Sequence, residues 1–460
     1  MNPQRDDVSP SPATDHPQYL GDLGPVLARR RIAAGIDTGG GVVLARPDSV
    51  LVRVTRDGER ETVAQLVADF DDKQAREIAQ RAPDGPFVTV RIPAQDGVGA
   101  ERKPNSLGAV NDLIGRFRTA GLTAELNTVF LGAQSFIGSP VGSAAEWVGE
   151  MAFPSTVATG PNGEPALLST AQPTTPPRVL RLPLNLKDRQ RPRVLVLDTG
   201  LRTESGAGTK PEHGELNQSV VHQPWLDRST AGSADDEDEP DDDGLGLLDF
   251  EAGHGTFICG IIRQLCPDAE IHVAGVLSSF GDGDVATVTE AMRRVIDLVG
   301  PPDVVVMSFG GNFPDDDPGL FGEALMELLG DAVGIAAAGN QGTCRPYFPA
   351  ALPGVIGVGG LAADGKAWFT NFGGWVDACA PAIDVVSTFF ADFTEEIEGH
   401  PTRQYTGWAR WSGTSFSAPK VAALIAQEQY LYGGTAAEAW KRMTSHKMLR
   451  SPDLGIVFNA

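Results

Sequence analysis

From Arg191 onward, short apolar runs alternate with amphipathic segments, and this alternation constrains the fold more than any other feature of the sequence. The apolar runs occupy residues 194–198, 271–276, 303–308, 333–338 and 355–359. Each run is mostly apolar, as expected of strands that are covered on both faces. A helical spacing is clearest between two of the runs, at Val285, Val288, Met292, Val295 and Val299. The pattern predicts an α/β fold with a doubly wound, mainly parallel sheet.

The composition restricts the partners of the chain. Of 460 residues, 41% are hydrophobic, and 60 Asp and Glu against 37 Lys and Arg give a net charge of −23. This acidity disfavours binding to nucleic acid or to anionic lipid. The N-terminal sequence has no apolar signal region, and no apolar run is long enough to span a bilayer. We therefore expect a cytoplasmic protein with neither a nucleic-acid nor a membrane partner.

The four cysteines have neither the density of a disulfide scaffold nor the spacing of a zinc site. They are Cys259, Cys266, Cys344 and Cys379. Buried free thiols are the simplest interpretation. A Cys344–Cys379 bridge is the alternative.

The first 190 residues divide into three segments that differ in composition and in the periodicity of their apolar residues. Residues 1–47 lack sustained periodicity and are predicted to form a mobile tail. Residues 48–132 alternate strand and helix patterns and are predicted to form a small β-α-β-α-β domain of ordinary size. Residues 133–190 are interrupted by GSP, GPNGEP and TTPP, which indicates a connector. The parallel sheet then belongs to a second domain, residues 191–460.

Four polar residues follow the predicted strands or begin the predicted helices of this second domain. Asp198 ends a buried strand in an Asp-Thr-Gly turn, and ligands of parallel sheets bind beyond such strand ends. His254 lies in GHGTFICG, Asn340 in AAAGNQG and Ser415 in SGTSFSAP. Each has an ordinary structural alternative: a loop histidine, a turn asparagine or a helix N-cap serine. Their joint occurrence in this order favours a chemical role.

On these motifs, residues 191–432 resemble the catalytic domain of the subtilases, the subtilisin-like serine peptidases. The chain order Asp, His, Ser is that of subtilisin. The resemblance implies that Asp198 orients His254, that His254 is the general base for Ser415, and that Asn340 stabilises the oxyanion. It also implies a subtilisin-like catalytic domain that hydrolyses protein or peptide substrates and needs no cofactor for the chemistry.

The resemblance further implies where an extended peptide would bind. Two protein edges would bracket the substrate, formed by Leu277, Gly281 and Gly283 on one side and by Ser308 and Gly310 on the other. Tyr347 aligns with the floor of the primary specificity pocket, so we expect a preference for small residues before the cut. Phe348–Pro349 is expected to be a cis bond. Lys420 departs from the family motif by replacing a histidine after Ser-Ala-Pro.

An acidic insertion at residues 231–243 separates Asp198 from His254. The segment DDEDEPDDD is predicted to be a solvated, self-repelling loop. Two alternatives remain: a structural calcium site formed by Asp241, Asp243 and Asp249, and a rim that favours basic substrates.

The resemblance leads to a prediction for the whole chain: a serine endopeptidase, with an intracellular processing or regulatory role. The N-terminal domain would then be either a propeptide-like inhibitor or an accessory domain. Two other functions are alternatives. One is a catalytically silent peptide-binding module, and the other is an aspartic peptidase that uses the Asp-Thr-Gly turns at both Asp37 and Asp198.

Overall fold

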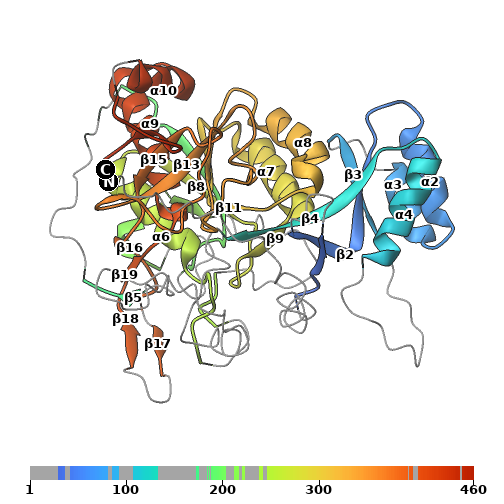
Figure 1. The fold of residues 1–460 in the computed structure, drawn as a ribbon, viewed down its shortest axis with the longest axis horizontal. Coiled ribbons are helices and arrows are strands. Elements are labelled where there is room, and N and C mark those ends of the chain that lie inside the picture. The colour runs from blue at the N-terminus through green and yellow to red at the C-terminus, as the bar shows by residue number, and fades with distance from the viewer. Residues whose placement is uncertain are drawn as a thin grey trace, which may run out of the picture.

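The structure is a computed structural model that describes most of the chain from residue 30 to residue 459. The described residues are 30–36, 42–80, 85–92, 107–132, 172–175, 184, 186, 188–203, 212–216, 220–222, 238–241, 246–391, 393–396, 402–445 and 448–459. Two units are seen in Figure 1, a smaller N-terminal one and a larger one. Over these residues, no helix combines the length and apolarity needed to cross a membrane.

A ten-stranded, mainly parallel sheet forms the centre of the larger unit (Figure 1). Its order is β20-β21-β15-β13-β12-β10-β6-β8-β7, with β14 paired to β13. The strands are β6 (Arg193–Asp198), β7 (Val220–His222), β8 (Glu270–Gly275), β10 (Val304–Met307), β12 (Val333–Ala337), β13 (Val355–Ala362), β14 (Gly365–Lys366), β15 (Ala378–Pro381), β20 (Arg450–Ser451) and β21 (Gly455–Val457). All five predicted strands are present, and the predicted fold class is confirmed.

Helices cover both faces of this sheet because alternate side chains of its strands enter two different cores. In β6, Val194 and Val196 pack toward one core, while Leu195 and Leu197 pack toward the other. The first core includes α6 (His254–Leu265), α9 (Ala418–Tyr432) and α10 (Ala436–Thr444), and the second includes α7 (Val285–Val299) and α8 (Gly319–Leu329). The α7 helix lies where the valine spacing predicts it.

The N-terminal unit contains most of a second sheet. Its strands β1 (Ala33–Ile36), β2 (Val42–Arg53), β3 (Phe87–Arg91) and β4 (Ala124–Gly132) are accompanied by α2 (Glu59–Ala68), α3 (Asp72–Gln80) and α4 (Gly108–Thr119). The structure differs from the sequence prediction at β1 and at the beginning of β2, which lie within the segment expected to be a tail. These strands form because they pair with each other, with Ala33 opposite Ala45. In a short segment, such pairing does not produce a periodic pattern of apolar residues that the sequence would show.

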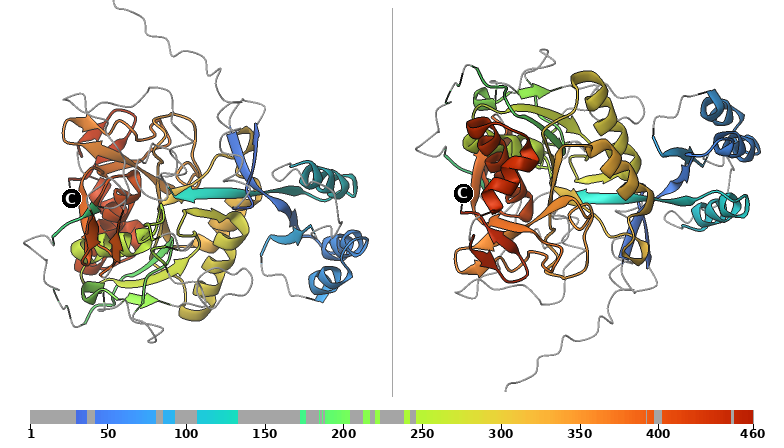
Figure 2. Two further views of the ribbon diagram at one scale, coloured as in Figure 1. Left: turned by 90° about the horizontal axis from the view of Figure 1, so that it is seen from below. Right: turned by 90° about the horizontal axis from the view of Figure 1, so that it is seen from above.

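The last strand of the N-terminal unit extends into the larger unit. Near its start β4 pairs with β2, with Ala124 opposite Val52. Its end lies between two short strands of the larger unit, β9 (Asp282–Asp284) and β11 (Phe309–Gly310), and is antiparallel to both. Figure 2 shows β4 as a long cyan arrow that runs from the small unit into the large one.

Smaller elements complete the described part of the chain. They are β5 (Gln172–Pro173), β16 (Val385–Thr388), β17 (Phe393–Glu395), β18 (Arg403–Tyr405), β19 (Trp408–Trp411) and the 3-10 turns Gly214–Leu216, Pro314–Asp316 and Thr414–Phe416.

All four cysteines are free thiols, so the alternative of a Cys344–Cys379 bridge is wrong. Three of the cysteines are buried as predicted, but Cys344 is exposed. Burial raises the pKa of Cys266 and Cys379 to about 12.

Candidate functional site

The structure brings Asp198 and His254 together where a turn meets the start of a helix. His254 Nδ1 lies 2.7 Å from Asp198 Oδ1, and both side chains are fully buried. The glycines of the two motifs permit this contact. A Cβ atom on Gly255 would lie 2.2 Å from the carbonyl oxygen of Gly200, so a larger residue would separate the turn from the helix. Asp198 is therefore committed to His254, which argues against the aspartic-peptidase alternative.

Two carboxylates lie within 4 Å of the ring nitrogens of His254. Its Nε2 atom lies 3.6 Å from Glu251 Oε2, and Glu251 is also fully buried. Burial opposes the positive charge on His254, but Asp198 and Glu251 outweigh this effect and raise the pKa of His254 to about 9. Trp411 packs against the ring edge-to-face, with ring centroids 5.4 Å apart. This environment favours the protonated form of His254.

Ser415 is placed beside Ser308 at the start of the α9 region. The Ser415 hydroxyl donates a hydrogen bond to the carbonyl oxygen of Ser308 (3.2 Å), and the Ser308 hydroxyl donates one to the carbonyl oxygen of Ser415 (2.9 Å). Within the described residues, His254 Nε2 has no hydrogen-bond partner. A hydrogen bond between Ser415 and His254, which the general-base role requires during the reaction, is therefore not formed in this conformation.

Asn340 is held in a fixed orientation by the turn that carries Ser415. Its Oδ1 atom accepts hydrogen bonds from the backbone amide of Thr414 (3.0 Å) and from the Thr414 hydroxyl (2.9 Å). Thr414 Oγ1 also accepts a hydrogen bond from the amide of Gly339 (3.1 Å). Because the oxygen end of the amide is engaged with donors, the Nδ2 end is the one suited to stabilise a negative charge.

The end of β4 occupies the groove between the two predicted substrate edges. Gly283 lies opposite Phe130, and Gly310 lies opposite Leu131. The amide of Gly132 donates a hydrogen bond to the carbonyl oxygen of Gly281 (2.7 Å). A strand of the same chain therefore binds where an extended peptide is expected to bind.

Two other predicted substrate residues do not pair with β4. Leu277 is buried in the core of the larger unit, and its amide donates to the carbonyl oxygen of Asp198 (3.0 Å). Ser308 precedes β11 and hydrogen bonds with Ser415 instead.

An aromatic side chain anchors β4 in this groove. Phe130 is fully buried, and its ring packs against the rings of Phe309, Phe313 and Phe321. The centroid distances to these rings are 5.4, 5.9 and 4.8 Å. Buried aromatic anchors of this kind typically dominate the energy of an interface.

Tyr347 borders the same groove. Its ring is buried so close to the backbone that a Cβ atom on Gly310 would lie 2.2 Å from Tyr347 Cε1. Burial raises its pKa. The peptide bond between Phe348 and Pro349 is cis as predicted. The Tyr347 ring thus lies against β11, and its role at the floor of a specificity pocket stays a prediction.

Glu251 separates Gly132 from His254. A Cβ atom on Gly132 would lie 2.8 Å from the Glu251 carboxylate, and one on Gly281 would lie 2.5 Å from Glu251 Cγ. The backbone amide of Glu251 donates to the carbonyl oxygen of Ser279 (2.7 Å). The glycine that ends β4 therefore fits over Glu251, and a side chain at this position would collide with it.

One carboxylate of the acidic insertion is buried in the core next to the candidate site. Asp238 is 1% exposed; it accepts hydrogen bonds from the amide of Gly253 (3.0 Å) and from the hydroxyl of Thr199 (3.1 Å). Burial raises the pKa of Asp238 well above its ordinary range. The prediction of a wholly solvated loop is wrong at this residue, because Asp238 fixes the residues that precede His254 and follow Asp198.

The calcium candidates do not form a cluster in the part of the chain that is described. Asp241 accepts a hydrogen bond from the amide of Gly246 (2.7 Å), and Asp249 accepts one from the hydroxyl of Ser279 (2.7 Å). No group of three metal-binding side chains gathers among the described residues. Asp243 and Asp37 lie outside the described residues.

The comparisons with known proteins agree with the motifs. A model of the subtilase family matches residues 190–455. A thermophilic serine proteinase of Bacillus sp. strain AK1 is 30% identical over 184 residues, 38% of this chain and 41% of the relative. Proteinase R of Parengyodontium album is 29% identical over 197 residues, 41% of this chain and 47% of the relative. The chain therefore spans less than half the length of these two relatives.

Solved structures are also similar to this chain. A crystal structure described as a cold adapted subtilisin-like serine proteinase is 22% identical to this chain, with a TM-score of 0.42. The match covers 61% of this chain and 95% of that one.

Proposed function

The chain belongs to the subtilase family, and on this premise we propose that it is a serine endopeptidase whose N-terminal unit blocks its own substrate groove. The observation that carries the proposal is the position of β4. It is antiparallel to both β9 and β11, and it ends beside the Asp198–His254 pair.

In the proposed reaction, the Ser415 hydroxyl turns from the carbonyl oxygen of Ser308 toward His254 Nε2. His254 accepts the hydroxyl proton as Ser415 Oγ bonds to the peptide carbonyl carbon, and Asp198 stabilises the resulting imidazolium. Asn340 Nδ2 and the Ser415 amide donate hydrogen bonds to the oxyanion. His254 then returns the proton to the leaving amine, and water hydrolyses the acyl-enzyme by the same steps.

The inhibitory role of the N-terminal unit is supported by how β4 binds. Its backbone pairs with both edges as a substrate strand would, and Phe130 fills an aromatic pocket. We infer that substrates are extended peptides with an aromatic residue at the position of Phe130. The Tyr347 ring, which lies against the backbone at Gly310, supports a preference for a small residue before the cut. Cleavage profiling that selected large aromatic residues immediately before the cut would contradict the preference for a small residue there.

The test is the intact mass of the protein after treatment with a fluorophosphonate, compared between the wild type and Ser415→Ala. One adduct on the wild type alone would establish an activated Ser415. The same spectrum would show whether the chain is cut after residue 132, which a propeptide-like role requires.

A catalytically silent peptide-binding module is the second candidate, and it is favoured by the absence of a Ser415–His254 hydrogen bond. A folded wild type that never gains an adduct, even after the N-terminal unit is removed, would favour the module. The cytoplasmic location and the intracellular role remain predictions, which cell fractionation would test.

A further inference from the structure

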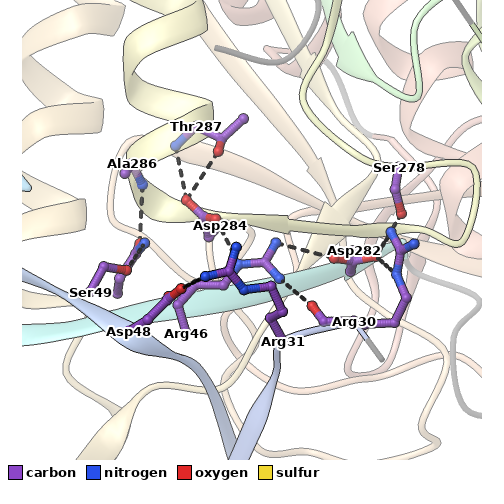
Figure 3. Close-up of polar contacts among 11 residues, drawn as sticks. Arg30, Arg31, Arg46, Asp48, Ser49, Ser278, Asp282, Asp284, Ala286 and Thr287 are labelled. Carbon is purple, nitrogen blue, oxygen red and sulfur yellow. Dashed lines mark hydrogen bonds and ion pairs between the residues drawn. The ribbon is translucent and has the colours of Figure 1, made fainter. Parts of the chain in front are cut away.

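The β9 edge carries two carboxylates that neither the triad nor the strand pairing uses. Figure 3 shows Asp282 and Asp284 facing two arginines of the N-terminal unit. Asp282 accepts hydrogen bonds from Arg30 Nε (2.9 Å), Arg30 Nη2 (2.6 Å) and Arg46 Nη2 (3.1 Å). Asp284 accepts one from Arg46 Nε (2.8 Å). These four residues are called the ionic clasp below.

The larger unit holds both carboxylates in place. The hydroxyl of Ser278 donates to Asp282 Oδ1 (2.6 Å). Asp284 Oδ1 caps the N-terminus of α7, because it accepts from the amide and the hydroxyl of Thr287 (3.0 and 3.1 Å). Burial opposes ionisation of Asp282, but Arg30 and Arg46 reverse the effect and lower its pKa. Both carboxylates of the ionic clasp are thus held in place, and the two arginines favour the charged form of Asp282.

The arginines come from two segments that the β1–β2 pairing brings together. Arg30 precedes β1, Arg46 lies in β2, and Arg46 Nη1 donates to the carbonyl oxygen of Arg30 (2.9 Å). The Arg30 guanidinium also lies over the ring of Phe280, 4.7 Å from its centroid. The side chains of Arg30 and Arg46 are only 22% and 18% exposed. Partly buried, charge-assisted pairs of this kind are stronger than surface ion pairs.

The ionic clasp matters because the backbone pairing in the groove is short. β9 contributes three paired residues and β11 contributes two. So short a ladder is marginal without side-chain support. Leu131 of β4 lies opposite Asp282 of β9. The ionic clasp therefore involves a residue of the same strand pairing that places β4 in the groove.

We propose that Asp282 and Asp284 form an arginine-binding surface on the larger unit, and that the N-terminal unit occupies this surface with Arg30 and Arg46 to keep β4 in the groove. This inference rests on the proposed function, since it names what holds the inhibitory strand. The partner that fits the surface is a paired-arginine segment, here supplied by the chain itself.

Hydrogen–deuterium exchange on the full chain tests the proposal. Ser415→Ala is the background, so that self-cleavage cannot alter the result. Arg46→Gln and Arg30→Gln are compared with Arg53→Gln, an arginine of β2 that also pairs with the larger unit, through Glu323 (2.6 Å). The Arg53–Glu323 pair is more exposed, with side chains 28% and 48% exposed, so its loss should matter little.

We expect the amides of residues 129–132 to exchange about tenfold faster in the Arg46→Gln and Arg30→Gln variants, and within about twofold of the background in Arg53→Gln. Residues 418–432 of α9 should not change in any variant. Asp282→Asn should reproduce the effect of Arg30→Gln on the exchange of residues 129–132. The variant that combines Arg30→Gln with Asp282→Asn should exchange little faster than either single variant.

Three results would overturn the proposal. They are equal exchange at 129–132 in all variants, an equal rise in α9, and additive effects of Arg30→Gln and Asp282→Asn. Fluorophosphonate labelling of the wild type reports separately on the peptidase. Faster exchange in a protein whose serine is inert would reject the peptidase but keep the ionic clasp.

Discussion

The amide of Gly132 donates a hydrogen bond to the carbonyl oxygen of Gly281 (2.7 Å), which ties the last described residue of β4 to an edge of the substrate groove. These residues are 149 positions apart in the chain, yet the contact continues the β4–β9 ladder in register. The N-terminal unit therefore binds the larger unit through the geometry expected of a substrate strand.

Gly132→Leu should weaken this inhibitory contact. The new side chain would begin 2.8 Å from the buried Glu251 carboxylate, and overpacking of this kind costs about 1–3 kcal/mol. We expect fluorophosphonate labelling of Ser415 to become at least about fivefold faster. Gly115→Leu is the control, because a Cβ atom there meets no neighbour within 4 Å. Equal labelling rates in the two variants would show that Gly132 does not limit access to the groove.

Glu251→Gln should lower the pKa of His254 from its value of about 9, since the negative charge of Glu251 is one of the causes of that raised value. Histidine-selective NMR titration would measure the change, with His254 assigned by substitution. Glu395→Gln is the control, because Glu395 is a buried carboxylate that pairs with Arg403 (3.1 Å). A pKa of His254 unchanged by Glu251→Gln would contradict the electrostatic role of Glu251.

The raised pKa also predicts how stability depends on pH. The folded value of about 9 for His254 lies above the unfolded value of about 6.5. Its contribution to stability is therefore complete below about pH 6.5 and is lost as the pH rises through about 9. Glu251→Gln should reduce this loss, which unfolding by denaturant across the pH range would measure.

Asp238→Ala should destabilise the protein although it lies in an acidic insertion. The change leaves the amide of Gly253 and the hydroxyl of Thr199 without their buried acceptor, at a cost of about 1–3 kcal/mol. Urea unfolding would measure this loss. Asp241→Ala in the same insertion should cost less than about 0.5 kcal/mol, since Asp241 is only partly buried. Equal losses in the two variants would mean that Asp238 has no special structural role.

The sequence predicts the central sheet and the polar residues at its edge because both depend on local patterns. Residues 194–197 are apolar throughout, and Asp198 and His254 lie in glycine-rich motifs that are read directly. Gly255 can be assigned a reason only from the structure, where it meets Gly200. The sequence therefore shows the motif, but only the structure shows why the motif needs a glycine.

Several features that the sequence does not predict join distant segments. Arg30 and Asp282 are 252 positions apart, and no periodicity or spacing marks either residue as a partner of the other. The same applies to Phe130 in its aromatic pocket and to Asp238 beside Gly253. Glu251 is only three positions before His254, so a carboxylate this close in sequence to a motif histidine was the available signal.

Thr414→Val should slow the reaction of Ser415 although Thr414 is not itself part of the predicted triad. Valine has nearly the same shape but lacks the hydroxyl that donates to Asn340 Oδ1 (2.9 Å) and accepts from the amide of Gly339 (3.1 Å). Without this anchor the Asn340 amide is less well ordered. We expect about a tenfold loss in the labelling rate, less than the roughly 10² to 10³ lost when an oxyanion donor is removed entirely.

The control for Thr414→Val is Ser417→Ala, which removes a hydroxyl from the same turn. Ser417 donates to the carbonyl oxygen of Ala380 (2.8 Å), away from Asn340. Both rates should be measured in the Gly132→Leu background, so that access to the groove is not limiting. If Asn340 is the oxyanion donor, Asn340→Ala should remove most of the difference between threonine and valine at position 414, because the anchored amide is then absent. A Thr414→Val effect that persists in full without Asn340 would assign the threonine another role.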